Sequence, residues 1–121
     1  PTYKPQWEIP GGIVELNESP RQACEREIGE ELGLQRTVTR LLSVSYLAPR
    51  PHYSEGIMFI FWGGRLSTAE IAQIRLPAQE LSEFRFVTLD EAVTLLTASL
   101  GARVRQSWAI LPTERTLYLE M

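Results

Sequence analysis

The segment between Ser19 and Gly33 carries the signals that begin and end a helix, and it constrains the fold more than any other part of the chain. Ser19 is a suitable N-cap, Pro20 suits the first helical position, and Gln22 completes a capping box with Ser19. Gly33 can adopt the left-handed backbone that ends a helix. We therefore expect a helix between these ends. Its buried stripe is predicted, at a four-residue spacing, to consist of Cys24, Ile28 and Leu32.

Three carboxylates fall close together at the end of this predicted helix. Glu27 precedes Glu30 and Glu31 by three and four residues, so the three side chains share one turn and repel one another. The helix dipole also disfavours negative charge in the last turn. Both costs indicate an added cation, and carboxylate oxygens are ligands that hold Mg2+.

The chain from Gly12 onward resembles the Nudix box, the sequence motif of the Nudix hydrolases. The matching residues are Gly12, Glu18, Arg26, Glu27, Ile28, Glu30, Glu31, Gly33 and Leu34. The run from Trp7 to Gly12 also resembles the usual lead-in to the box. The resemblance implies an α/β fold, namely an α/β/α sandwich around a mixed β-sheet, in a single domain over residues 1–121. It also implies that the first strand or strands of that domain precede Pro1.

The resemblance further implies a Mg2+-dependent hydrolase, with Mn2+ as the alternative ion. Such an enzyme cleaves the pyrophosphate bond of a nucleoside diphosphate linked to another moiety, either a nucleotide sugar such as ADP-ribose or a nucleoside triphosphate. A divalent metal suits this reaction because it neutralises the anionic pyrophosphate and lowers the pKa of bound water. By their positions in the motif, the metal ligands would be Glu27, Glu30, Glu31 and the carbonyl of Gly11.

Other charged residues would complete the implied site. Arg26 would steady the carboxylates through charge-assisted contacts, with Glu18 as its opposite-charge partner. In many relatives the general base is a glutamate before a later strand, a region that here contains Glu80 and Glu83. We favour Glu80 as the base or a further metal ligand, with Glu31 as the alternative base. The expected catalytic residues are Glu30, Glu31, Glu80 and Arg26.

Substrate-binding residues are expected outside the box, and the candidates are Glu8, Arg50 and Tyr53. Arg50 and Tyr53 lie in a proline-containing loop predicted over 48–56. Arg50 could pair with phosphate, and Tyr53 could stack on a nucleobase. His52 lies between them, but a solvated loop histidine is the simpler interpretation.

The composition limits the partners and the location. A net charge of −3 provides no electrostatic footprint for nucleic acid or an anionic membrane. One cysteine excludes an internal disulfide and fits a reducing compartment, so we expect a cytoplasmic protein. The longest apolar run, 57–62, is too short to cross a bilayer. The expected partner is a nucleotide-type small molecule, without nucleic acid or membrane, and a homodimer is possible.

The rest of the chain alternates between strand and helix signals. Strands are predicted over 7–9, 13–15, 37–47, 84–87 and 116–119, an edge strand over 71–76, and a buried central strand over 57–62. Helices are predicted over 89–98 and 102–111, and the inner face of the second is predicted to carry Val104, Trp108 and Leu111.

Two other functions compete with hydrolysis. A catalytically silent nucleotide-binding or regulatory module would keep the fold, but such domains usually lose box glutamates, and this chain retains all of them. Removal of RNA caps would require a basic surface that follows the RNA, which the charge balance does not supply. Both functions rank below hydrolysis of a small nucleotide derivative.

Overall fold

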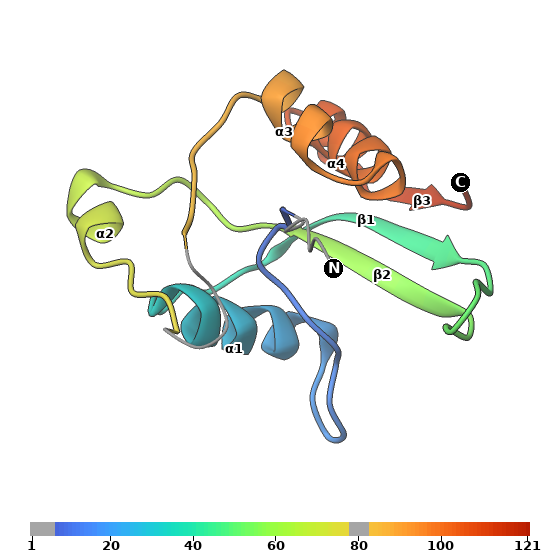
Figure 1. Cartoon of the computed structure of the whole chain (residues 1–121), viewed down its shortest axis with the longest axis horizontal. Coiled ribbons are helices and arrows are strands. Elements are labelled where there is room, and N and C mark those ends of the chain that lie inside the picture. Colours follow the sequence, from blue (N-terminus) through green and yellow to red (C-terminus); the bar gives the residue numbers. More distant parts are fainter. Residues whose placement is uncertain (1–6, 78–82) are drawn as a thin grey trace, which may run out of the picture. The chain divides into compact units, whose positions relative to one another are not determined.

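A computed structural model of the protein describes residues 7–77 and 83–121. Its elements, in chain order, are α1 (Pro20–Leu32), β1 (Arg40–Leu47), β2 (Gly56–Trp62), α2 (Thr68–Ala72), α3 (Leu89–Leu95), α4 (Ala98–Ile110) and β3 (Leu117–Leu119) (Figure 1). The chain packs as two compact units. Of the described residues, the helix unit comprises 9–40, 61–77 and 83–85, and the sheet unit comprises 7–8, 41–60 and 86–121.

The strands form a three-stranded sheet with the order β2-β1-β3. β1 and β3 run parallel, with Ser43 opposite Leu117 and Ser45 opposite Leu119. Residues 48–55, which join β1 to β2, are too few for a parallel crossover, so these two strands run antiparallel. The sheet is therefore mixed, as predicted. The strands predicted over 37–47 and 116–119 are confirmed with shorter bounds.

The apolar run 57–62 forms a strand, but the prediction that this strand is central and buried was wrong. Within the described sheet β2 lies at an edge and β1 lies in the middle. Ile57 is 63% exposed and Phe59 is 36% exposed. An apolar run carries no information about which strands will flank it, so a half-exposed edge strand and a buried central strand have similar signals.

Four other predicted strands are not found among the described residues. Residues 7–9, 13–15 and 84–87 are irregular, and α2 and a turn occupy the region predicted as 71–76. Strand formation depends on a hydrogen-bonded neighbour, which β-propensity alone does not supply. For α2 the missed signal was a capping box, in which the side chains and backbone N–H groups of Ser67 and Glu70 bond reciprocally.

Helices over 89–98 and 102–111 are confirmed as α3 and α4 with shifted bounds, but the predicted inner face of α4 was wrong at Trp108. Trp108, expected on that face, is 51% exposed. The buried residues of α4 are Gly101, Arg103, Ser107 and Ile110. The Oγ atoms of Ser107 and Ser43 lie 2.8 Å apart, and Arg103 donates to the carbonyl of Met121 at 2.5 Å. A search for apolar periodicity cannot find a buried face that is largely polar.

In the helix unit, α1 has both predicted ends. The Ser19 side chain accepts from the Gln22 N–H, and the Gln22 side chain accepts from the Ser19 N–H. Pro20 is the first helical residue, and Gly33 ends the helix with φ 70°. These signals were correct because each acts within four residues of the helix terminus that it defines.

The core of the helix unit forms around the predicted stripe of α1. Ile28 is buried with Leu34 and Val38, while Cys24 and Leu32 are partly buried against them. The Glu25 side chain accepts from the Val38 N–H at 2.9 Å. These contacts restrict rotation of α1 about its axis and thereby set the direction in which its glutamates point. No helix in the two described ranges has the length and apolar character needed to span a membrane.

Candidate metal centre

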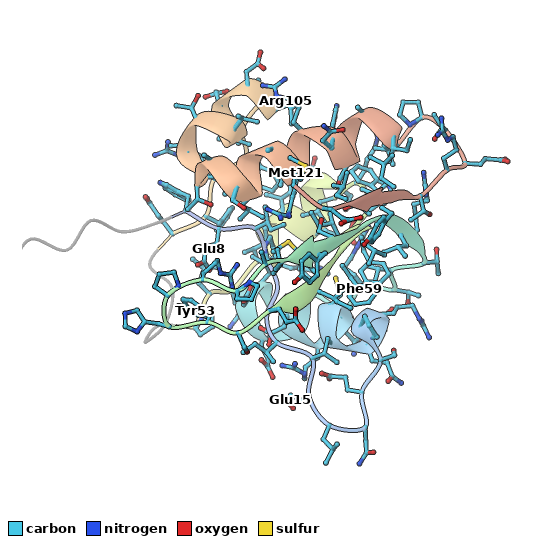
Figure 2. All side chains as sticks on the ribbon, turned by 90° about the vertical axis from the view of Figure 1, so that its right-hand side faces the viewer. Glu8, Glu15, Tyr53, Phe59, Arg105 and Met121 are labelled. Carbon is cyan, nitrogen blue, oxygen red and sulfur yellow. The ribbon has the colours of Figure 1, made fainter. Side chains whose placement is uncertain are left out.

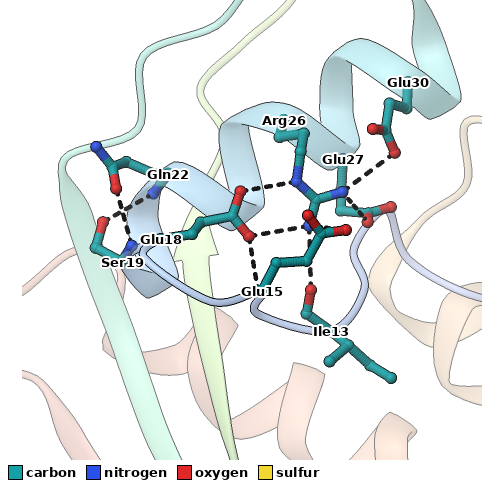
Figure 3. Close-up of polar contacts among 8 residues, drawn as sticks. All are labelled: Ile13, Glu15, Glu18, Ser19, Gln22, Arg26, Glu27 and Glu30. Atoms are coloured by element: carbon teal, nitrogen blue, oxygen red, sulfur yellow. Dashed lines mark hydrogen bonds and ion pairs between the residues drawn. The ribbon is translucent and has the colours of Figure 1, made fainter.

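Arg26 is at the centre of a cluster of charged side chains on α1 and in the segment before it (Figure 3). Its Nε and Nη2 donate to the two oxygens of Glu18, at 2.7 and 3.0 Å. Nη1 donates to Glu27 Oε1 at 2.6 Å and to Glu30 Oε2 at 3.2 Å, and Nη2 donates to the Ile13 carbonyl at 3.1 Å. These five bonds match the five N–H donors of a guanidinium. The contact expected between Arg26 and Glu18 is present.

The charges in this cluster stabilise one another. The hydrogen bond from Arg26 lowers the pKa of the Glu18 carboxyl below its ordinary value, and the backbone N–H of Glu15 lowers it further. Conversely, the hydrogen bonds to Glu18 and then to Glu27 raise the pKa of Arg26. The pair is therefore fully ionised at neutral pH, so the bidentate contact is charge-assisted and geometrically specific.

Gly11 and Gly12 bring the chain against the same carboxylates. The Gly11 N–H donates to Glu31 Oε2 at 3.1 Å. A Cβ atom on Gly12 would lie 2.5 Å from Glu27 Oε1, a distance that real Cβ atoms essentially never show. Glycine at position 12 therefore permits the close approach of backbone to carboxylate. One oxygen of Glu27, of Glu30 and of Glu31 is thus held by Arg26 or by backbone.

The donor chemistry of this cluster fits a hard divalent cation. Glu15 Oε1 lies 3.8 Å from Arg26 Nη2, so four carboxylates surround one guanidinium and leave an excess of negative charge. Carboxylate oxygens are the ligands that Mg2+ prefers, and an added cation would offset this excess. Within residues 7–77 and 83–121, no group of three or more His, Cys, Asp or Glu side chains is already gathered as a metal cage. Within those ranges, the cluster therefore offers the donor chemistry for a cation without a formed cage.

The candidate substrate residues Arg50 and Tyr53 lie in the β1–β2 connection, in the sheet unit. Figure 2 labels Tyr53. Their backbones pair through two hydrogen bonds of 3.0 and 2.9 Å, and His52 between them has φ 70°. The Arg50 guanidinium lies 5.0 Å from the centroid of the Tyr53 ring, and Tyr53 is 67% exposed. A tight turn thus presents a cation and an aromatic ring to solvent.

The other predicted site residues come from other parts of the sequence. Glu8 is exposed in an irregular segment assigned to the sheet unit. Glu83 is exposed and irregular, and Glu80, the favoured base, lies outside the described residues. Two participants were missed in the sequence: the Ile13 carbonyl, which is backbone and has no side-chain signal, and Glu15, whose proximity to Arg26 depends on the path of the loop.

A family model for the NUDIX domain matches residues 1–107 of the 121 in this chain. The chain therefore belongs to the NUDIX family, as the motif predicted. A solved structure of the MutT protein from Methanosarcina mazei Go1 matches 89% of this chain and 75% of its own with a TM-score of 0.73. The two sequences are 21% identical, so this likeness shows the fold. The predicted α/β Nudix fold is confirmed.

Curated relatives include several enzymes that act on phosphoanhydrides. An RNA pyrophosphohydrolase of Hydrogenovibrio crunogenus (strain DSM 25203 / XCL-2) is 35% identical over 95 residues, which cover 68% of this chain and 56% of the relative. An 8-oxo-dGTP diphosphatase of Proteus vulgaris is 47% identical over 47 residues, covering 38% and 42%. A CTP pyrophosphohydrolase of Escherichia coli (strain K12) is 59% identical over 32 residues, covering 26% and 24%. The matches thus span about half or less of the length of these relatives.

Proposed function

We propose that this chain belongs to a Mg2+-dependent hydrolase that cleaves the pyrophosphate bond of a nucleoside diphosphate linked to another moiety. Both a nucleotide sugar such as ADP-ribose and a nucleoside triphosphate fit this description, and Mn2+ is the alternative ion. The observation that carries the proposal is the cluster on α1. There Arg26 donates to carboxylate oxygens of Glu27 and Glu30, and the Gly11 N–H donates to Glu31.

We assign the binding of the metal to the side chains of Glu27, Glu30 and Glu31 and to the Gly11 carbonyl. The metal, when bound, supplies charge neutralisation at the pyrophosphate and lowers the pKa of the attacking water. Arg26 and Glu18 orient the ligands because each contact removes rotational freedom from a carboxylate. Such orientation keeps the donor oxygens on one side of α1, where a phosphate oxygen could also reach the ion.

The proton of the attacking water requires a base. We propose Glu80 for this role or as a further metal ligand, and Glu31 as the alternative base. The assignments predict different effects of substitution. If Glu80 is the base, Glu80→Gln should impair turnover while the metal affinity stays within about tenfold, and if Glu80 is a ligand, the metal affinity should fall further. Glu31→Gln should impair both turnover and metal affinity, since Glu31 is also a proposed ligand.

Recognition of the nucleotide is assigned to Arg50, Tyr53 and Glu8. The exposed Tyr53 ring can stack on a base, since every base has a π-face, and Arg50 adds a cation suited to phosphate. The names of the relatives suggest which compounds to test first. These are RNA, 8-oxo-dGTP, CTP and, from a diphosphoinositol polyphosphate phosphohydrolase of Rattus norvegicus, a diphosphoinositol polyphosphate.

We place the enzyme in the cytoplasm. Burial raises the pKa of the half-buried Cys24 thiol, and Glu25 raises it further, so the thiol stays protonated and its reactivity is low. This environment fits a structural cysteine in a reducing compartment. A homodimer remains a prediction, which light scattering on the full-length protein would check.

The experiment is a substrate panel with product identification, carried out on the full-length protein with Mg2+ and with Mn2+. The panel contains the four compounds above, ADP-ribose and unmodified nucleoside triphosphates. Metal-dependent release of a monophosphate, or of pyrophosphate from a triphosphate, is expected for at least one compound. Tight nucleotide binding without turnover would instead identify a silent module, and an intact panel with no binding would contradict the proposal.

A further inference from the structure

Residues 11–18, here named the strap, form an irregular segment that leads into α1 and exposes apolar side chains. Ile13 is 85% exposed and Leu16 is 92% exposed, so burial of side chains contributes little to the order of the strap. Asn17 has φ 65°, a left-handed backbone conformation that asparagine adopts more readily than most residues. Because the apolar side chains are exposed, polar contacts are the main source of order in the strap.

The polar contacts of the strap end on the charged cluster. The Gly11 N–H donates to Glu31, the Glu15 N–H donates to Glu18 Oε1 at 2.9 Å, and the Ile13 carbonyl accepts from Arg26. Arg26 in turn holds Glu27 and Glu30 through Nη1 (Figure 3). Two routes thus join the proposed ligands to the strap: a direct route from Glu31 to Gly11, and a route through Arg26 and Glu18 to residues 13–15.

We propose that Arg26 is a positioning residue that couples metal occupancy on α1 to the order of the strap. The inference rests on the proposed function, because it requires a divalent ion at Glu27, Glu30 and Glu31. Without an added cation, the carboxylates around one guanidinium repel one another. An ion that neutralises them removes the repulsion and leaves Arg26 anchored to Glu18 and to the Ile13 carbonyl. The strap then becomes more ordered next to the bound ion.

Hydrogen exchange at two backbone amides tests this coupling. The Glu15 amide reports the route through Arg26 and Glu18, and the Gly11 amide reports the direct route. We expect saturating MgCl2, without substrate, to lower the hydrogen-exchange rate of both amides about tenfold. This is the effect of stabilising one hydrogen bond to a charged group. NMR on the full chain measures both rates, and calorimetry in the same buffer shows whether the metal is bound.

The variant Arg26→Lys separates the two routes. Lysine keeps the charge but has three donors in place of the five that Arg26 uses, so it cannot serve both Glu18 and the Ile13 carbonyl while holding Glu27 and Glu30. At saturating Mg2+ the Gly11 amide of this variant should still slow, and the Glu15 amide should not. The control Glu25→Gln, on α1 but bonded to the Val38 N–H, should respond as the original chain does.

Each outcome decides the inference. Bound Mg2+ with unchanged exchange at both amides would overturn the coupling and leave the proposed metal centre intact. Equal slowing of the Glu15 amide in Arg26→Lys would show that the strap responds without Arg26 and would also overturn it. Absence of metal binding by calorimetry would remove the metal centre itself, and the coupling with it.

Discussion

The charged cluster of the helix unit and the Arg50–Tyr53 turn of the sheet unit are both candidates for binding substrate. They differ in how many interactions fix their side chains. In the cluster, Arg26 alone makes five hydrogen bonds, to side chains and backbone of the strap and of α1. In the turn, two backbone hydrogen bonds pair Arg50 with Tyr53, and the guanidinium lies over the Tyr53 ring. Dense contacts suit metal ligands, which need fixed geometry. An exposed, lightly held ring suits recognition that tolerates variation in the ligand.

The largest effect is expected in the cluster, from Glu30→Gln. The substitution removes one ligand charge while preserving shape, so we expect kcat to fall about 100-fold or more, as when one charge-stabilising group of an active site is lost. The Glu30 side chain is 57% exposed, so the melting temperature should change little. Steady-state kinetics and thermal unfolding together check this. A fully active variant would contradict the assignment of Glu30 as a ligand.

The next effect is expected from Gly12→Ala. Its Cβ would overlap Glu27 Oε1, and displacement of this carboxylate should weaken metal binding about tenfold or more. Gly29→Ala is the matched control, because a Cβ there meets its nearest atom at an ordinary 3.8 Å. In a helix interior that change should stabilise the fold by about 1 kcal/mol and leave metal binding unaltered. Equal metal affinity in the two variants would show that Gly12 does not position Glu27.

A smaller effect is expected in the turn, from Tyr53→Ser. Loss of a stacking ring should raise KM for a nucleotide about tenfold, with kcat nearly unchanged, because stacking contributes equally before and during the reaction. Tyr53→Phe keeps the ring and should behave as the original protein. If both variants have the original KM, the turn does not contact the base, and substrate recognition lies elsewhere.

The smallest effect is expected outside both regions, at Glu70. Its pKa lies below the ordinary 4.5, first because of the Ser67 backbone N–H and also because of Arg36, whose Nη1 lies 2.5 Å from Glu70 Oε2. A lowered pKa contributes stability above about pH 4.5, and this contribution disappears as the pH falls through the lowered value. Glu70→Gln should therefore have a lower melting temperature than the original protein at pH 6, and the difference should shrink as the pH falls below 4.5. A difference that stays constant as the pH falls would contradict the ionic origin.

The sequence predicted the cluster better than it predicted the rest of the fold. The ends of α1, its buried stripe and the pairing of Arg26 with Glu18 were all expected from residues within one motif. The predictions that failed concern strands and faces. β2 was expected in the centre of the sheet, and Trp108 was expected on the inner face of α4. The roles of Ile13 and Glu15 were missed because neither has a distinctive signal in the sequence.

The sequence by itself determined the caps of α1, the spacing of its glutamates and the membership of the NUDIX family. These features depend on residues that are near one another along the chain, where helical geometry fixes which side chains meet. Tertiary structure decided that β2 lies at an edge and that the inner face of α4 is polar. Those features depend on contacts such as that between Ser43 and Ser107, 64 residues apart, and on which partner each strand finds. No local pattern carries that information, because the competing arrangements bury similar residues.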